Sequence, residues 1–234
     1  MNRVSDTLQK DIAMPLQSEL DAFRTGWESR VGETIARLIA GDIEDLRGTG
    51  ILDRTARAGD MLPVATNLVD QHRAAFDLAA LAAEKPVIVT FYRGGWCPYC
   101  NLELRAYQAV LTDIHGAGAE LVAVTPELPD HALTTAEKND LSFAVLSDVG
   151  GELASALGIR FLLSDAVRPF YEKAGHALPD RNGDGTWALP MPATFVVARG
   201  GVIAAAFVEP DYRRRLDPQQ ALDALKAIRT QAAA

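Results

Sequence analysis

The chain has 234 residues, of which 48% are hydrophobic and 23% charged, and its formal net charge is −8. This composition suits one domain with an appendage, or two small domains, and it excludes a globally disordered chain. The acidic balance argues against a nucleic-acid or anionic-membrane partner, which would require clustered Lys and Arg. The one dense basic run, Arg213–Arg215, is flanked by Asp211 and Asp217.

The first twenty residues contain no apolar run long enough for a secretory signal, and no stretch reaches the ~20 apolar residues of a membrane span. We therefore expect a cytoplasmic protein that makes no membrane contact. The only two cysteines, Cys97 and Cys100, are separated by two residues. In a reducing compartment such a pair is more often redox-active or metal-binding than a structural staple.

The N-terminal part of the chain is predicted to be helical from Thr7 to about Leu46. Pro15 breaks or starts a helix there, and apolar residues then recur at steps of three and four: Leu16, Leu20, Phe23, Trp27, Val31, Ile35 and Leu38. We assign residues 1–50 to a helical N-terminal extension. A stripe of this kind covers a core more often than it catalyses a reaction, and it is also compatible with a homodimer.

After Asp60 the pattern changes to alternating strands and helices. Apolar, β-branched runs predict buried strands at 86–92, 119–126 and 143–148, and a hairpin at 193–208. The segments between them, at 101–115, 130–141 and 150–159, are predicted helices, and a last helix starts at Pro218 with Asp217 as its cap. The order predicts an α/β domain of three layers with a mixed sheet.

The two cysteines fall where the strand 86–92 gives way to a helix. A helix N-terminus carries unpaired N–H groups and partial positive charge, which favour a thiolate over a thiol. With Cys97 at the cap and Cys100 one turn inside, both sulfurs face one side and a disulfide can close with little backbone movement. Pro98 suits the first helical position. We therefore predict a redox-active pair.

Neither a metal nor a cofactor is expected. Structural zinc needs four ligands, and the histidines are scattered without ligand spacing: His72, His115, His131 and His176. Residues 180–185, Asp-Arg-Asn-Gly-Asp-Gly, match the start of a calcium loop, but Met191 stands where that loop requires a bidentate glutamate.

Four blocks of sequence resemble a known family: residues 59–63, 86–101, 143–159 and 192–203. They are similar to the alkyl hydroperoxide reductase/thiol-specific antioxidant (AhpC/TSA) group of the thioredoxin superfamily, and within it to the peroxiredoxin-like subfamily that carries Cys-x-x-Cys. The likeness covers about residues 60–209. It implies a thioredoxin-like fold with a mixed central sheet, which we place at residues 58–230, and dithiol chemistry.

The chain departs from the peroxiredoxin pattern Pro-x-x-x-Thr-x-x-Cys. The resemblance puts the peroxidatic cysteine at Cys100, the threonine at Cys97 and the proline at Arg93. Peroxiredoxins also carry an arginine shortly before the late Thr-Phe strand, where this chain has Pro192. Proline at that place is the thioredoxin pattern, in which a cis peptide packs against the disulfide, so we expect a cis Met191–Pro192 bond.

Other residues are predicted to support the pair. Arg93 either supplies the charge that the missing family arginine would give or forms a surface salt bridge, and Arg168 and Arg213 are more remote candidates. Trp96 and Tyr99 either present an apolar surface to the substrate or pack the helix start against the sheet. The supporting set is Arg93, Trp96, Pro98, Tyr99, Pro192 and Thr194.

Two more segments carry expectations. Residues 162–189 interrupt the fold just before Pro192 and are a candidate rim over the cysteines, anchored by Tyr171 and Trp187. Asp148 is predicted to cap the helix that follows it.

Three functions agree with these features. The first is a peroxiredoxin-like thiol peroxidase, in which a hydroperoxide oxidises Cys100, Cys97 condenses with it, and thioredoxin or a low-molecular-weight thiol reduces the disulfide. The second is a protein disulfide reductase, in which Cys97 attacks and Cys100 resolves. The third is a non-enzymatic redox sensor or interaction protein that uses the helical stripe. The resemblance favours the first, and the order of the two sulfurs stays open.

Overall fold

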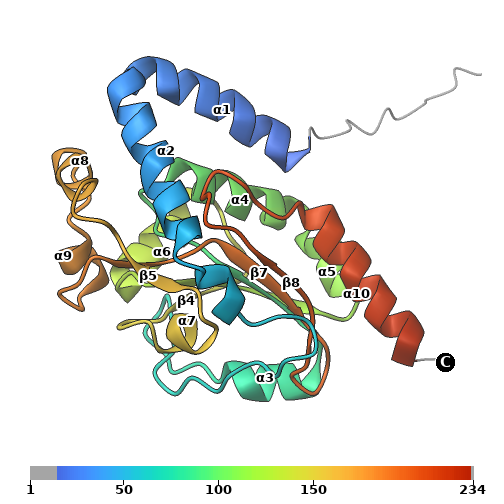
Figure 1. Cartoon of the computed structure of the whole chain (residues 1–234). Coiled ribbons are helices and arrows are strands. Elements are labelled where there is room, and N and C mark those ends of the chain that lie inside the picture. The colour runs from blue at the N-terminus through green and yellow to red at the C-terminus, as the bar shows by residue number, and fades with distance from the viewer. Residues whose placement is uncertain (1–14, 233–234) are drawn as a thin grey trace, which may run out of the picture.

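A computed structural model describes residues 15–232, and a six-stranded sheet lies at its centre in the order β1-β4-β3-β2-β7-β8 (Figure 1). The strands are β1 (Val69–Asp70), β2 (Val87–Phe91), β3 (Glu120–Thr125), β4 (Ala144–Ser147), β7 (Ala193–Val197) and β8 (Ile203–Val208). The strands β2, β3 and β4 are parallel, whereas β1, β7 and β8 run antiparallel to their neighbours. The sheet is therefore mixed, as predicted.

Helices cover both faces of this sheet. One face carries α4 (Pro98–Ala109), α5 (Leu111–Gly116), α6 (Pro129–Lys138) and α10 (Pro218–Ala232), and the other carries α3 (Leu78–Glu84) and α7 (Glu152–Ala156). Ile88 of β2 packs into the first face, and its neighbours Val87 and Val89 pack into the second. Because both faces are buried, the central strands β2, β3 and β4 are mostly apolar. This is the thioredoxin-like three-layer arrangement that we expected.

The N-terminal extension forms two helices, α1 (Leu16–Val31) and α2 (Glu33–Gly48), and a short 3₁₀ turn, η1 (Ile51–Arg54). The first helix begins directly after Pro15, and the predicted helical residues 7–14 lie outside the described part of the chain. The apolar pattern alone did not reveal the break at Gly32, where a φ of 81° favours glycine.

The apolar stripe of the extension packs inside the chain. Leu16 and Leu20 belong to the core cluster that contains the cysteine pair, and Trp27, Ile35 and Leu38 are half-buried against a cluster with residues of the 162–189 segment. In Figure 1 α1 lies over α4, and α8 lies beside α2. The prediction that the stripe covers a core is confirmed.

The 162–189 segment contains α8 (Arg168–Lys173) and α9 (Leu178–Asn182), and a small two-stranded sheet of β5 (Arg160–Leu162) and β6 (Ala188–Pro190) closes its base. This sheet was not predicted, because strands of three residues give no periodic signal. The predicted helix at 101–115 is interrupted at Val110. None of the helices within residues 15–232 has the length and apolar character needed to cross a membrane.

Candidate active site

The cysteine pair lies at the start of α4, directly beyond the carboxyl end of β2. Cys97 is the N-cap residue, Pro98 is the first residue of the helix, and Cys100 lies one turn in, as predicted. Both thiols are free and buried, with 2% of Cys97 and none of Cys100 exposed. Any small molecule that reacts with them must therefore enter the protein.

Two glycines shape the loop between β2 and the cysteines. A Cβ at Gly95 would come within 2.0 Å of Thr135 Oγ1, and Gly94 has a φ of 149°. The Gly95 N–H donates to Glu127 Oε2 at 2.7 Å, and Arg181 of α9 binds the other oxygen of this buried carboxylate at 2.8 Å. The 162–189 segment is therefore tied to the backbone that positions Cys97.

A buried polar network surrounds Cys100. Its sulfur accepts the Arg93 backbone N–H at 3.4 Å and a hydrogen bond from Arg215 Nη2 at 3.5 Å. Arg215 also forms an ion pair with Glu103 at 2.6 Å, with both side chains 1% exposed. Glu103 accepts from Thr90 at 3.4 Å, and Thr90 contacts Thr194 at 3.2 Å. Thr194 therefore reaches the sulfur only through this chain of contacts.

Arg93 is buried in an aromatic cage rather than paired on the surface. Its guanidinium carbon lies 4.0 Å from the ring centre of Tyr212 and 5.2 Å from that of Trp96, and its Nη2 donates to the Tyr171 hydroxyl. Within residues 15–232 no carboxylate lies within ion-pair distance of it, and its Nε has no hydrogen-bond partner. Of the two alternatives for Arg93, the surface salt bridge is therefore wrong.

The charges around the pair favour a thiolate on Cys97. Burial raises the pKa of Cys97, but the hydrogen bond from the Cys100 thiol and the charges of Arg93 and Arg215 outweigh it and lower the pKa to about 6. Burial, the hydrogen bond to Cys97 and the charge there raise the pKa of Cys100. The Cys100 sulfur also accepts hydrogen bonds from the Arg93 N–H and from Arg215. These bonds are compatible with a raised pKa of Cys100, because a thiol can accept them while it donates its own proton to Cys97. Cys97 therefore ionises first.

Glu103 is the third titratable group at this centre. Burial raises its pKa to about 7, against the opposing effect of the Arg215 charge and the hydrogen bond from Thr90. Arg215 is paired with Glu103, whereas the charge of Arg93, which has no carboxylate partner in residues 15–232, lowers the pKa of Cys97.

Trp96 packs against the 162–189 segment, and Tyr99 packs against α1 of the N-terminal extension. Trp96 stacks on His176 at 4.9 Å and meets Tyr171 edge-on at 5.5 Å, and Tyr99 meets Phe23 of α1 edge-on at 5.1 Å. None of these ring contacts is with the sheet, so they do not support the predicted packing of the helix start against the sheet, and the role of the two side chains toward a substrate stays a prediction. The 162–189 segment does lie beside the pair, with Tyr171 inside the site.

One expectation at this site is wrong, because the residues from 15 to 232 contain no cis peptide bond and Met191–Pro192 is trans. Pro192 is buried, and its carbonyl accepts the Glu209 N–H at 3.2 Å. The carbonyl therefore engages the segment after β8.

Pro192 also lines a narrow pocket with Arg93, Tyr212 and Ile43 of α2. The pocket has room for about one water molecule. This pocket therefore reaches Arg93.

The sequence analysis missed Arg215 and Glu103. Glu103 lies three residues after Cys100 on the same helix face, and a charged residue at an inward helical position was the available signal. Of the remote candidates, Arg168 binds the Leu163 carbonyl and Arg213 binds Asp211, so neither contacts the sulfurs. The arginine that does reach a sulfur, Arg215, lies two positions after Arg213 in the same basic run.

Metal binding finds no support in residues 15–232, where no group of three or more His, Cys, Asp or Glu side chains is placed to hold an ion. In the loop 180–185, Asp184 binds Arg160 and Thr186. Asp148 accepts the N–H groups of Leu153 and Ala154, which confirms its predicted role as a cap of α7.

Comparisons with known proteins agree with this geometry. Peroxiredoxin Q, chloroplastic, of Populus jackii is 30% identical over 97 residues, which are 42% of this chain and 45% of that protein. The chain therefore matches less than half the length of this relative.

Solved structures show the same fold. Peroxidoxin BcpB of Mycobacterium tuberculosis has a TM-score of 0.58 at 20% identity, covering 74% of this chain and 97% of its own. Peroxiredoxin Q of Xanthomonas campestris has a TM-score of 0.52 at 18% identity, covering 76% and 97%. The model of the AhpC/TSA family matches residues 58–206, more than half of the chain. The chain belongs to the AhpC/TSA family, with the thioredoxin-like fold.

Proposed function

We propose that this chain is a thiol-dependent peroxidase, which reduces hydroperoxides through a dithiol/disulfide cycle of Cys97 and Cys100. The observation that carries the proposal is a reduced, buried Cys-x-x-Cys pair between two arginines, one of which has no carboxylate partner among the described residues. Such a site stabilises negative charge on sulfur and on the oxygen that leaves the peroxide. Membership of the AhpC/TSA family supports the same chemistry.

Cys97 is the first nucleophile in this proposal. Its thiolate attacks the hydroperoxide, an S–O bond forms, and the O–O bond breaks. The leaving oxygen takes a proton and departs as an alcohol or as water, which leaves a sulfenic acid on Cys97. The low pKa of Cys97 and its position at the cap of α4 both favour this order over attack by Cys100.

Cys100 then resolves the intermediate. Its sulfur forms the S–S bond, the S–O bond of the sulfenic acid breaks, and water leaves with the Cys100 proton. Two thiol equivalents reduce the disulfide and are themselves oxidised to a disulfide. We propose thioredoxin or a low-molecular-weight thiol as their source, and the cytoplasm as the compartment, because both keep such a pair reduced.

The arginines take the place of the donors that the family threonine and arginine would supply. Three buried N–H groups around the pair have no partner among the described residues: Arg93 Nε, Trp96 Nε1 and Arg215 Nε. Unpaired buried donors are rare, and an acceptor that arrives during the reaction explains them. A peroxide has two such acceptor oxygens.

A protein disulfide reductase is the second candidate. Attack by Cys97 before Cys100 agrees with this function as well as with the peroxidase. Two observations count against it. Cys97 is only 2% exposed, whereas a sulfur that attacks another protein must be accessible, and the bond before Pro192 is not cis. A third candidate, a redox sensor, requires only that the cysteine pair be oxidised, and it does not require catalytic turnover.

The deciding experiment exposes the native protein, Cys97→Ser and Cys100→Ser to hydrogen peroxide and to an alkyl hydroperoxide, with a sulfenic-acid trap read by mass spectrometry. We expect an adduct on Cys97 in Cys100→Ser, none in Cys97→Ser, and turnover of the native protein with a thiol donor.

The other outcomes separate the alternatives. An adduct on Cys100 in Cys97→Ser, formed as fast as in the native protein, would reverse the order of the sulfurs. Slow peroxide reaction with rapid reduction of insulin would establish the disulfide reductase instead. Oxidation of the cysteine pair by peroxide without catalytic turnover would favour the redox sensor over both enzymes.

A further inference from the structure

The segment 209–217, between β8 and α10, carries two groups of the site. Arg215 lies 3.5 Å from the Cys100 sulfur, and the Tyr212 ring lies 4.0 Å from the Arg93 guanidinium carbon. This segment begins beyond residue 206, where the match to the family ends. The charge beside Cys100 therefore comes from outside the matched region.

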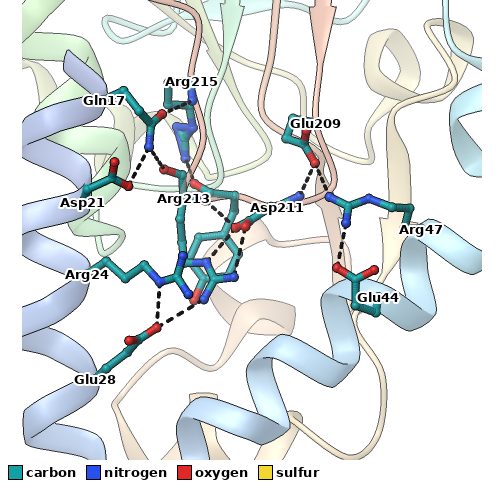
Figure 2. A network of polar contacts seen from close by, with 11 residues as sticks. Gln17, Asp21, Arg24, Glu28, Glu44, Arg47, Glu209, Asp211, Arg213 and Arg215 are labelled. Carbon is teal, nitrogen blue, oxygen red and sulfur yellow. Dashed lines mark hydrogen bonds and ion pairs between the residues drawn. The ribbon is translucent and has the colours of Figure 1, made fainter. Parts of the chain in front are cut away.

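The N-terminal extension holds this segment at its backbone (Figure 2). Gln17 of α1 donates from Nε2 to the Arg213 carbonyl at 3.4 Å, and its Oε1 accepts the Arg215 N–H at 3.4 Å. Next to it, the Leu16 N–H donates to Asp217 at 3.1 Å. The side-chain amide nitrogen and oxygen of Gln17 therefore bind the backbone on both sides of Arg214, and one of the two bonds is to Arg215 itself.

A second set of contacts holds the other half of the segment. The Arg213 guanidinium binds Asp211 at 2.7 Å and approaches Glu28 of α1 at 3.6 Å. Glu209 accepts from Arg47 of α2 at 2.6 Å, and Figure 2 shows both helices reaching the segment. The segment has no helix or strand of its own, so contacts with its neighbours determine where Arg215 lies.

We propose that the extension is part of the active-site machinery, with Gln17 as a positioning residue that places Arg215 against Cys100. Packing alone does not require this side chain, because Leu16 and Leu20 supply the buried apolar contacts of α1. A charge acts on a reacting sulfur only when it is held close, and a displacement of about 1 Å costs up to about a hundredfold in rate.

The chain contains a matched control for Gln17. Gln17 Nε2 donates to Asp21 at 2.9 Å, and Gln219 Nε2 donates to Asp223 at 2.9 Å, so both glutamines bind an aspartate four residues on in a helix. Only the Gln17 side chain also binds the 209–217 segment, whereas Gln219 contacts that segment through its backbone N–H, which donates to Asp217 and is retained in alanine. Gln17→Ala and Gln219→Ala therefore differ in the contact under test.

The measurements are the alkylation rate of the reduced pair at neutral pH, the peroxide reduction rate, and the thiolate absorbance near pH 6. We expect Gln17→Ala to slow both reactions about tenfold and to lose thiolate absorbance, and Gln219→Ala to stay within about twofold of the native protein. Gln17→Glu retains the acceptor for the Arg215 N–H, so we expect it to recover to within about threefold.

A double-mutant cycle tests whether Gln17 acts through Arg215. Arg215→Lys retains a charge beside Glu103 but loses the planar fork that reaches Cys100. In that background Gln17→Ala is expected to change the rates less than about twofold, because the contact that it positions is already lost. An equal loss in both backgrounds, or equal rates for Gln17→Ala and Gln219→Ala, would overturn the proposal.

The inference deepens the proposed function but rests on it only for the peroxide assay. If the native protein fails to reduce peroxide while Gln17→Ala still slows alkylation, the proposed function is wrong and the positioning role stands. If peroxide is reduced and Gln17→Ala behaves as Gln219→Ala does, the positioning role alone is wrong.

Discussion

The region that matches the AhpC/TSA family and the segments outside it contribute different parts of the site. Residues 58–206 supply both sulfurs, Arg93 and Glu103. The extension and the segment 209–217 supply Arg215, Tyr212 and the cover of α1 over α4. The sulfurs are thus held by the family fold, whereas one of the nearby charges comes from the segment 209–217 and part of the apolar cover comes from the extension.

The two arginines show what this difference means. Arg215 has a buried carboxylate partner, Glu103, at 2.6 Å. Arg93 has no carboxylate within ion-pair distance in residues 15–232, and its charge lowers the pKa of Cys97. The arginine of the added segment is therefore paired with a carboxylate, whereas the arginine of the family region is not.

The largest effect is expected for Arg93→Met. Without this charge the pKa of Cys97 rises, and the peroxide reaction at neutral pH falls by about 10²–10³-fold. Folding is not expected to suffer, because a buried charge is replaced by a packed apolar side chain. The measurement is stopped-flow peroxide kinetics beside urea unfolding, with Arg168→Met as the control. A rate within threefold of the native one would contradict the assigned role of Arg93.

Leu20→Ala tests the cover that the extension provides. Leu20 is fully buried in the cluster that contains both cysteines, so its truncation is expected to cost about 2–5 kcal/mol in the free energy of unfolding. A bulky thiol reagent should also react faster, because the pair becomes accessible. Leu52→Ala, at a side chain 39% exposed, is the control for denaturant unfolding and reagent kinetics. Equal losses in the two variants would show that α1 does not close over the pair.

Glu103→Gln tests the charge balance through the pH dependence of stability. The folded pKa of Glu103, about 7, lies above its ordinary 4.5, so between these values the folded protein binds more protons than the unfolded chain. The free energy of unfolding therefore falls as pH rises through this window, by up to about 3 kcal/mol, and Glu103→Gln abolishes that loss.

The measurement for Glu103 is urea unfolding of the reduced protein at several pH values from 4.5 to 7. The lowered pKa of Cys97 adds stability as pH rises above about 6, but it does so in both proteins and largely cancels in their difference. Glu120→Gln, at a carboxylate paired with Lys85 on the surface, is the control. The same pH profile for the native protein and Glu103→Gln would refute the burial of an ionisable carboxyl at this place.

The smallest effect is expected for Arg37→Ala, on an exposed helix face of the extension. Arg37 pairs with Glu33, and both side chains are at least 75% exposed. Such pairs contribute about 0.3–0.5 kcal/mol, and this one contacts no part of the site. Thermal unfolding and peroxide kinetics should both match the native protein. A clear loss of activity would mean that the extension acts through more of its surface than Gln17.

The sequence by itself determined the central elements and the position of the sulfurs. The runs at 86–92, 119–126 and 143–148 became β2, β3 and β4, because strands buried on both faces are near-continuous apolar runs. The place of Cys97 at the cap of α4, with Pro98 after it, followed from the strand-to-helix change and from the first-turn preference of proline. These signals are local, so they can be read along the chain.

Only the tertiary structure decided which charges surround the sulfurs. Arg215 reaches Cys100 from 115 residues away, and Gln17 holds the Arg215 backbone across 198 residues. The sequence around Arg93 was equally compatible with a surface salt bridge. An arginine just after a strand can be exposed or enclosed, and the side chains that enclose it, Tyr171 and Tyr212, are distant in the sequence. Contacts between distant segments leave no periodic pattern, so the electrostatics that distinguish the two cysteines appear only when the chain is folded.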